Sequence, residues 1–225
     1  MPMPLDSSFF ARPTLAVARD LLGALLVHES PDGRLSGRVV ETEAYLADDP
    51  AMHGWKATFG ADGRVLPQGR AAGLFAAPGT AYVYKIYHTN WLLNVVTEPE
   101  GVAGAVLIRA LEPVEGEERM AENRPPSVRK RRDLANGPGK LTQALGIAES
   151  PDAVRSRFHQ TDLTRPPLCF EPGDPVPDAQ VETSSRIGLS RGADLDYRFF
   201  VSGNAFVSPG TPSDVRLAQK THRRR

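Results

Sequence analysis

The chain has 225 residues, 40% of them hydrophobic, which is enough for one well-buried domain. Lysine plus arginine and aspartate plus glutamate are balanced at 27 each, so no overall basic field points to nucleic acid. The single cysteine, Cys169, excludes a disulfide framework, a thiolate zinc site or an iron–sulfur cluster formed by this chain alone, and it favours a reducing compartment. No charged and apolar leader opens the sequence and no run of about 18 apolar residues occurs, so we expect neither secretion nor a membrane span.

The N-terminal part of the chain predicts a helix followed by a β-hairpin. Pro13 to Gly23 carries apolar side chains at helical spacing, with Thr14 as the expected cap and a glycine at the end. Ala24–His28 and Leu35–Leu46 are typical of strands, and the turn Pro31-Asp32-Gly33 between them predicts a hairpin.

The middle of the chain predicts a loop, a second hairpin and a central strand. Ala57–Ala77, rich in glycine and basic residues, is expected to be a long loop. Tyr82–Tyr87 and Trp91–Val96 are separated by His88-Thr89-Asn90, which predicts a hairpin with its tip at that turn. The near-continuous apolar run Ala105–Leu111 indicates a central strand.

The remaining elements complete one mixed α/β domain. Val114–Arg124 predicts an acidic amphipathic helix, and Asn136-Gly137-Pro138 opens a helix over Gly139–Leu145. The proline-rich segment Glu149–Glu182 is expected to wind over the surface. Late strands are expected at Arg186–Leu189, Tyr197–Val201 and Asn204–Val207. No internal repeat or linker divides the chain, and the hairpins favour a mostly antiparallel sheet.

The segment VVETEAYL, Val39 to Leu46, raises the first functional question. In a strand, side chains alternate between two faces. Val39, Glu41, Glu43 and Tyr45 would share one face, and Val40, Thr42, Ala44 and Leu46 the more apolar other. An acid beside an aromatic on a buried-looking strand is a reason to examine catalysis.

A family resemblance rests on segments spread over most of the chain. They run in order from Phe9 to about Val207: FFARPTLAVARDLLG, GRVVETEAYLADDPAMHG, FAAPGTAYVYKIY, LNVV, AVLIRALEP, NGPGKLTQALGI and RIGL. Read together, they resemble the alkyladenine (3-methyladenine) DNA glycosylases. The resemblance implies a single mixed α/β (α+β) domain, with a curved, mostly antiparallel sheet, surrounding helices and a protruding DNA-inserting β-hairpin. We therefore expect one domain over residues 1–225, with a core at 9–207 and a basic C-terminal tail at 208–225.

The same resemblance implies an activity. The expected enzyme is a monofunctional glycosylase of base excision repair, without a metal or other cofactor. It would flip an alkylated or deaminated purine, of the 3-methyladenine, 7-methylguanine, hypoxanthine and ethenoadenine class, out of duplex DNA and hydrolyse its N-glycosidic bond. The expected partner is double-stranded DNA containing damaged purines. We expect a monomer in the cytoplasm, not on a membrane, and at the nucleoid if the source is bacterial.

Catalytic roles are carried over residue by residue. Glu43 falls at the position of the general base, where a carboxylate takes a proton from water and offsets positive charge on the sugar. Arg109 matches an arginine that positions this water and a phosphate, and Ile187 a residue whose backbone carbonyl helps to hold the water. Taken alone, Glu43 could be a half-exposed strand residue and Arg109 a member of an ion pair. Glu41 is expected to be structural.

The resemblance also implies a base pocket. Tyr45, His53 and Tyr84 match positions that enclose the flipped base, and Asn94 an asparagine that crowds the exocyclic amine of guanine. Aromatic rings attract a positively charged alkylpurine by roughly 0.5–2 kcal/mol. Without the resemblance, each tyrosine could be an ordinary core residue and His53 a loop residue. Tyr82 would line the same pocket or pack beneath it.

Other positions are candidates for DNA contact. Tyr87 matches the intercalating residue, and a hairpin-tip aromatic suits a minor-groove wedge. His88 stands where the family has glycine, which costs strain if a positive φ is needed, and it could contact a phosphate instead. Lys140, behind a helix N-terminus, and the basic residues Arg129 and Lys130 suit DNA phosphates. A helix cap and a solvated basic face are the alternatives. Between His53 and Phe75 the chain is longer than the family pattern, and Arg64 and Arg70 there could touch DNA.

Three rival functions stay open at this point. Glu41 and Glu43 could form a two-carboxylate sugar hydrolase, because i and i+2 on a strand lie about 6.5–7 Å apart and inversion needs about 6.5–9.5 Å. Asp48, Asp49 and His53 could hold a metal of a hydrolase, although their spacing is loose. A non-catalytic module could also bind damaged DNA through Tyr87 and the basic runs.

Overall fold

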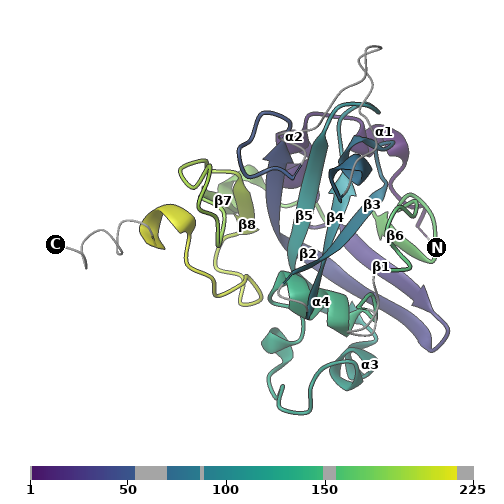
Figure 1. Cartoon of the computed structure of the whole chain (residues 1–225). Coiled ribbons are helices and arrows are strands. Elements are labelled where there is room, and N and C mark those ends of the chain that lie inside the picture. Colours follow the sequence, from purple (N-terminus) through teal and green to yellow (C-terminus); the bar gives the residue numbers. More distant parts are fainter. Residues whose placement is uncertain (1, 54–69, 87–88, 149–155, 217–225) are drawn as a thin grey trace.

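The computed structural model describes residues 2–53, 70–86, 89–148 and 156–216, and one curved antiparallel sheet dominates them (Figure 1). Its strands are β1 (Leu25–Ser30), β2 (Gly33–Leu46), β3 (Ala81–Ile86), β4 (Asn90–Val96), β5 (Gly104–Glu115), β6 (Leu168–Glu171), β7 (Val181–Ser184) and β8 (Arg198–Val201). The helices are α1 (Ser7–Phe10), α2 (Thr14–Asp20), α3 (Glu117–Glu122) and α4 (Pro138–Ala144), with 3-10 turns η1 (Arg70–Phe75), η2 (Arg131–Asp133) and η3 (Asp178–Gln180). The expected single mixed α/β domain with a mostly antiparallel sheet is confirmed.

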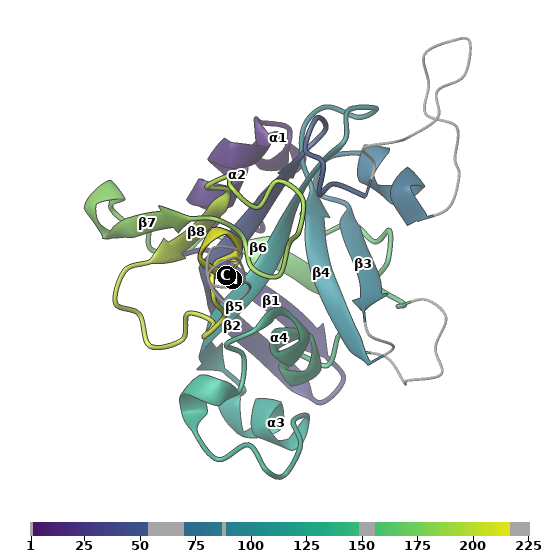
Figure 2. The same cartoon turned by 60° about the vertical axis from the view of Figure 1, so that its left-hand side comes forward.

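The sheet runs in the order β3-β4-β5-β2-β1-β6, and β8 pairs with both β2 and β7. Figure 2 shows β3 at one side of the sheet and the β7–β8 ribbon at the other. The first predicted hairpin is confirmed, with Ser30 paired to Gly33 across a two-residue turn. β5 occupies the centre, as its apolar run predicts. The long strand β2 therefore pairs with β1, β5 and β8.

The second predicted hairpin is confirmed as a pair of strands. β3 pairs with β4, with Tyr82 opposite Asn94 and Tyr84 opposite Leu92. The expected tip residues Tyr87 and His88 lie outside the described residues, so a protruding, DNA-inserting tip stays a prediction. Helix α4 begins at proline as predicted and packs on β4, where the hydroxyl of Thr142 donates to the carbonyl of Trp91 at 2.9 Å.

Helix α2 is present, but its expected cap is wrong. Thr14 is the first helical residue, and its side chain makes no capping bond. Instead its backbone N–H and its hydroxyl donate to the carboxylate of Glu98, at 2.7 and 2.8 Å. A carboxylate from the loop between β4 and β5 thus satisfies the helix start. After the helix, Gly23 has φ +92°, and a Cβ there would lie 2.1 Å from the carbonyl oxygen of Asp174.

A bulge changes the faces of β2. Its pairing with β5 slips after Val39, which leaves Val40 as an extra residue. Val39 consequently joins the main core with Ala44, whereas Val40 packs beside Phe206. The expectation that Val39 shares a face with the two glutamates is wrong, because one extra residue reverses the alternation.

A second bulge lies on β5. Glu41 pairs with Ala110 and Thr42 with Ile108, which leaves Arg109 as the extra residue. Ile108 packs into the main core, while Arg109 contacts Glu41 on the other side of the sheet. Bulges commonly re-aim a side chain beside a functional site. Here the bulge directs the side chain of Arg109 away from the main core and toward Glu41.

Several other predicted elements need correction. The acidic helix is shorter than expected, because Val114 still belongs to β5 and Gly116, in the left-handed region at φ +72°, precedes α3. The segment Glu149–Glu182 is not all surface, since β6 within it is buried and pairs with β1. In the expected long loop, residues 70–75 form η1.

The late strands are confirmed in part. Tyr197–Val201 contains β8 as predicted. Arg186–Leu189 contributes only the isolated bridge of Ile187 with Pro212, and Asn204–Val207 is a turn. Segments without strand pairing can therefore still carry alternating apolar residues, because they dock individual side chains on the sheet.

The main core lies between α1, α2 and α4 and one face of the sheet. Its fully buried members include Phe10, Val17, Leu21, Leu26, Ile108, Leu141 and Phe170. No helix within the described ranges is long and apolar enough to cross a membrane.

Candidate active site

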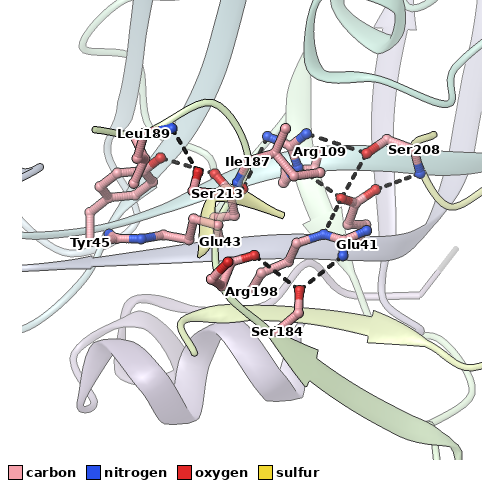
Figure 3. Close-up of polar contacts among 12 residues, drawn as sticks. Glu41, Glu43, Tyr45, Arg109, Ser184, Ile187, Leu189, Arg198, Ser208 and Ser213 are labelled. Carbon is pink, nitrogen blue, oxygen red and sulfur yellow. Dashed lines mark hydrogen bonds and ion pairs between the residues drawn. The ribbon is translucent and has the colours of Figure 1, made fainter. Parts of the chain in front are cut away.

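Glu43 lies on β2 with its side chain fully buried. One carboxylate oxygen, Oε1, accepts the backbone N–H of Ile187 at 2.7 Å and lies 3.2 Å from the Nη1 of Arg109. The other, Oε2, accepts the hydroxyl of Tyr45 at 2.9 Å. Figure 3 shows these groups converging on Glu43 from different elements. A buried carboxylate requires such donors, and here three elements supply them.

Glu41 is also fully buried and is bonded on both oxygens. Its Oε1 accepts the Nε of Arg109 at 2.8 Å, the Nε of Arg198 at 2.7 Å and the hydroxyl of Ser208 at 2.8 Å. Its Oε2 accepts the backbone N–H of Ser208 at 2.6 Å. Burial raises the pKa of Glu41, but the charges of Arg109 and Arg198 and the hydrogen bonds outweigh it, so the pKa is lowered overall.

This environment argues against a two-carboxylate sugar hydrolase. Such an enzyme needs one carboxyl group that holds a proton near neutral pH and faces the bond to be cleaved. Glu41 has a lowered pKa and both its oxygens are bonded to protein groups. Unlike Glu43, which is bonded to the pocket residue Tyr45, Glu41 is bonded only to residues that do not line the pocket, as expected of a structural residue.

Beside this charged cluster lies a pocket that the aromatic candidates share. The imidazole Nδ1 of His53 lies 3.0 Å from the hydroxyl of Tyr82, and the rings of His53 and Tyr84 are edge-on with centroids 4.7 Å apart. The pocket is partly open to solvent, and the centres of water-sized molecules can occupy about 80 Å³ of it. Its lining residues are Tyr45, Ala51, Met52, His53, Leu74, Tyr82, Tyr84, Asn94, Ala105 and Leu189.

Asn94 and Tyr82 are tied together across the hairpin. The side-chain Nδ2 of Asn94 donates to the carbonyl of Tyr82 at 3.0 Å, which orients the amide in the pocket wall. Tyr82 itself lines the pocket, which answers the question left open by its sequence position. The hydroxyl of Tyr45 reaches Glu43, so Tyr45 belongs both to the pocket and to the charged cluster. Burial, followed by the charge of Glu43, raises the pKa of Tyr45 well above its ordinary value.

Arg186 is a site residue that sequence reasoning missed. It is fully buried, with its guanidinium carbon 4.5 Å from the centroid of the Tyr45 ring. It donates to the carbonyl of Ala44 at 2.9 Å and is paired with both carboxylate oxygens of Asp49. The only signal in the sequence is its place directly before Ile187. Its guanidinium packs on the Tyr45 ring, and this ring lines the pocket.

The pairing of Asp49 with Arg186 also weakens the metal hypothesis. An aspartate whose two oxygens are bonded to a guanidinium lacks a free oxygen for a cation. Across the described residues, no group of three or more histidine, cysteine, aspartate or glutamate side chains could hold a metal ion. Asp48 and His53 therefore do not form a metal-ligand cluster with it.

Arg198 and Ser208, which contact Glu41, were also missed as site residues. Ser208 and Ser213 are buried, and the hydroxyl of Ser213 accepts the N–H of Leu189 at 2.8 Å. Ser208 and Ser213, which fall in the expected tail, therefore pack against site residues, whereas Val215 is exposed. Residues 217–225 lie outside the described part of the chain.

Among the described candidates for DNA contact, Lys140, Arg129 and Lys130 do not join this cluster. The Nζ of Lys140 donates to the Oδ1 of Asn136 at 2.7 Å, at the start of α4. Arg129 and Lys130 are exposed in the segment before η2. Their roles, and those of Tyr87 and His88, stay predictions; Arg64 lies outside the described residues, and of Arg70 only its place at the start of η1 is described.

Known proteins match this chain over nearly its whole length. A family model described as Methylpurine-DNA glycosylase (MPG) matches residues 8–205. A relative from Salinibacter ruber, named "Putative 3-methyladenine DNA glycosylase", is 58% identical over 212 residues, which are 93% of this chain and 98% of the relative. Relatives of the same name from Prosthecochloris aestuarii and Methanoculleus marisnigri are 45% and 41% identical, over 91% and 92% of this chain and 90% and 99% of their own.

These matches define the class of protein as a DNA glycosylase, an enzyme of base excision repair. The chain belongs to the methylpurine-DNA glycosylase family.

Proposed function

We propose that this protein flips alkylated or deaminated purines out of duplex DNA and hydrolyses their N-glycosidic bond with a water activated by Glu43. The proposed product is an abasic site in an uncut strand: the described residues that line the pocket include no lysine, whose amine could form the Schiff base of a lyase step. One observation carries the proposal: the fully buried Glu43 is bonded to Tyr45, whose ring lines the pocket. Glu43 would therefore lie beside the glycosidic bond of a base that enters this aromatic pocket.

The contacts of Glu43 suit the role of a general base. The Tyr45 hydroxyl, the Ile187 N–H and the Arg109 guanidinium all carry protons that they can donate to Glu43. An ionised carboxylate only accepts hydrogen bonds, so these partners suit it. An ionised carboxylate can take the proton of an attacking water and can offset the positive charge that develops on the sugar. Arg109, 3.2 Å from Glu43, would orient this water and a DNA phosphate. The carbonyl of Ile187, beside the N–H that holds Glu43, would accept from the same water.

The pocket suits a flipped purine. Tyr45, His53 and Tyr84 supply aromatic faces, which stack on a base and attract a cationic alkylpurine. Asn94, oriented by Tyr82, would crowd the exocyclic amine of guanine and so favour adenine-derived lesions and hypoxanthine. The names of the relatives support 3-methyladenine as one substrate.

The elements around the hairpin suit contact with double-stranded DNA. A Cβ on Gly139 would lie 2.9 Å from the Oδ1 of Asn90, so the start of α4 sits against the start of β4. Lys140, which follows Gly139, is therefore near the turn end of the β3–β4 hairpin, where Ile86 pairs with Asn90. We propose that Tyr87 fills the gap left by the flipped base and that Lys140, His88, Arg129 and Lys130 contact phosphates. The chain would act as a monomer, as one glycosylase domain over residues 1–225.

The decisive experiment uses duplexes that carry hypoxanthine, 1,N6-ethenoadenine or 3-methyladenine. After incubation with the protein, hot alkali converts abasic sites into strand breaks. We expect breaks with the wild type, none without alkali, and a loss of at least about 100-fold in rate for Glu43→Gln. Glu118→Gln, on the surface of α3, is the matched control and should keep full activity.

Each alternative outcome has a distinct meaning. Binding to lesion duplexes without any breaks would support the non-catalytic module. Full activity of Glu43→Gln would refute Glu43 as the base. Breaks that form without alkali would refute the absence of a lyase step.

A further inference from the structure

Arg109 is held by more than the catalytic carboxylate. Its Nε donates to Glu41 at 2.8 Å, its Nη1 lies 3.2 Å from Glu43, and its Nη2 donates to the hydroxyl of Ser208 at 3.3 Å. All three guanidinium nitrogens are thus engaged, and Glu41 provides the shortest of the contacts. Since Arg109 stands at a bulge, strand pairing alone does not fix its direction.

Glu41 in turn is held by Arg198 from β8. The Nε of Arg198 donates to Glu41 at 2.7 Å and its Nη1 donates to the hydroxyl of Ser184 at 3.0 Å. Its guanidinium carbon lies 4.3 Å from the centroid of the Phe200 ring. Figure 3 shows the resulting row of side chains, from Ser184 through Arg198 and Glu41 to Arg109. Only one end of this row reaches Glu43.

We propose that Glu41 and Arg198 are positioning residues for base excision: they aim Arg109 at Glu43 and balance the charge of the buried site. This inference rests on the proposed role of Glu43 as the general base. Neither residue touches the pocket, so neither would contact the substrate. Their effect on the reaction would pass through Arg109.

The charges around Glu43 support the second half of the proposal. Glu41 and Glu43 are two buried negative charges, and Arg109 and Arg198 are the two buried positive charges that match them. On the other side, Arg186 is paired with Asp49, and Tyr45 stays neutral because its pKa is raised. Loss of Arg198 would leave excess negative charge beside Glu43. Loss of the Glu41 charge would leave excess positive charge.

A pH profile separates this role from a merely structural one. Excision is measured under single-turnover conditions from about pH 4 to 9, and its acid limb reports protonation of the general base. Negative charges about 6.5–7 Å apart on one strand are coupled by about one to two pH units at the effective dielectric of a protein. We therefore expect the acid limb of Glu41→Gln to move to lower pH by about that amount. The acid limb of Arg198→Gln should move to higher pH.

Two further variants serve as controls. Arg198→Lys keeps the positive charge and should keep the acid limb of the wild type, even if the rate falls. Arg119→Gln removes an equal charge from α3, where Arg119 pairs with Asp32 at the exposed turn before β2, and should change nothing. Thermal unfolding of every variant shows whether it is folded. If Glu41→Gln is not folded, the pair Arg198→Gln and Arg198→Lys still decides the question.

The proposal is overturned if the acid limbs of Glu41→Gln and Arg198→Gln coincide with that of the wild type, or if both move in the same direction. That failure is distinct from a failure of the proposed function. If only the positioning proposal fails, Glu43→Gln remains inactive while the two acid limbs stay fixed or move together. If the proposed function fails, Glu43→Gln itself is active.

Discussion

Two clusters of arginines and glutamates lie at opposite ends of β2. In the hairpin cluster, Arg34 is paired with Glu29, with Glu115 at 3.2 Å and with Glu171 at 2.7 Å. In the site cluster, Arg109 and Arg198 are paired with Glu41 and Glu43. The side chains differ in exposure: that of Arg34 is 22% exposed and that of Glu115 48%, whereas those of the site cluster are at most 8% exposed.

The two clusters differ in burial, and burial decides how strongly the protein depends on each partner of an ion pair. Water screens Glu29 and Glu115 in the hairpin cluster, so the pairs of these two residues with Arg34 add little stability. In the site cluster each charge depends on its partners, because a charge left alone in the interior is very unfavourable. Such a cluster keeps its charges in fixed positions, which is what a reaction that develops charge requires.

The largest expected effect is on stability, from Glu41→Ala. This change leaves Arg109 and Arg198 without their shared buried partner, and we expect unfolding free energy to fall by about 3–5 kcal/mol. Urea denaturation followed by circular dichroism measures the loss. A loss below about 1 kcal/mol would mean that the site cluster behaves like an exposed pair.

The second expected effect is on stability at acid pH. Burial by itself raises the pKa of Glu41, but Arg109 and Arg198 lower it below its ordinary value of 4.5. The stability that this group contributes is therefore present above pH 4.5 and is lost as the pH falls toward the folded-state pKa. We expect the melting temperature of the wild type to fall more steeply below pH 4.5 than that of Glu41→Gln. Parallel curves would contradict the assignment.

A smaller effect is expected from Ser208→Ala. The variant loses the hydroxyl that donates to Glu41 at 2.8 Å but keeps the backbone N–H that donates at 2.6 Å. A hydrogen bond to a charged group contributes about 1.5–3 kcal/mol. The same denaturation assay should give a loss in that range. No loss would show that the backbone N–H is sufficient to satisfy Glu41.

The smallest effect is expected from Arg34→Gln in the hairpin cluster. We expect a loss of at most about 1 kcal/mol, decreasing as salt is raised, and an unchanged rate of excision. Denaturation at low and high salt, with the alkali cleavage assay, measures both. Glu171 is the one well-buried member, with 5% of its side chain exposed. A large loss of unfolding free energy that salt does not reduce would therefore come from Glu171. It would mean that the two clusters do not differ as proposed.

Much of the fold could be predicted from local patterns. The turn at Pro31-Asp32 and the paired strands β1–β2 and β3–β4 follow from alternation and turn residues. The short strand β6 could not, because four residues among prolines carry too little periodic signal. Its partner, β1, is far away in the sequence and decides its conformation.

Part of the site could be predicted as well. Glu43 and Tyr45 stand two residues apart, so strand alternation brings them together, and the structure places their side chains 2.9 Å apart. Arg109 was expected from the family resemblance, and its direction depends on the bulge on β5. No local pattern marks Val40 or Arg109 as the extra residue in its strand.

The sequence by itself determined the alternation of β2 from Glu41 to Leu46, the two hairpins and the pair of Glu43 with Tyr45, because these depend on residues close along the chain. Only the tertiary structure decided the surroundings of Glu41. Its partner Arg198 lies 157 positions further on and Ser208 lies 167. Local periodicity cannot encode a contact across such a distance, since it arises only when β8 and the following segment dock on β2. The charge balance of the site is therefore a property of the folded chain.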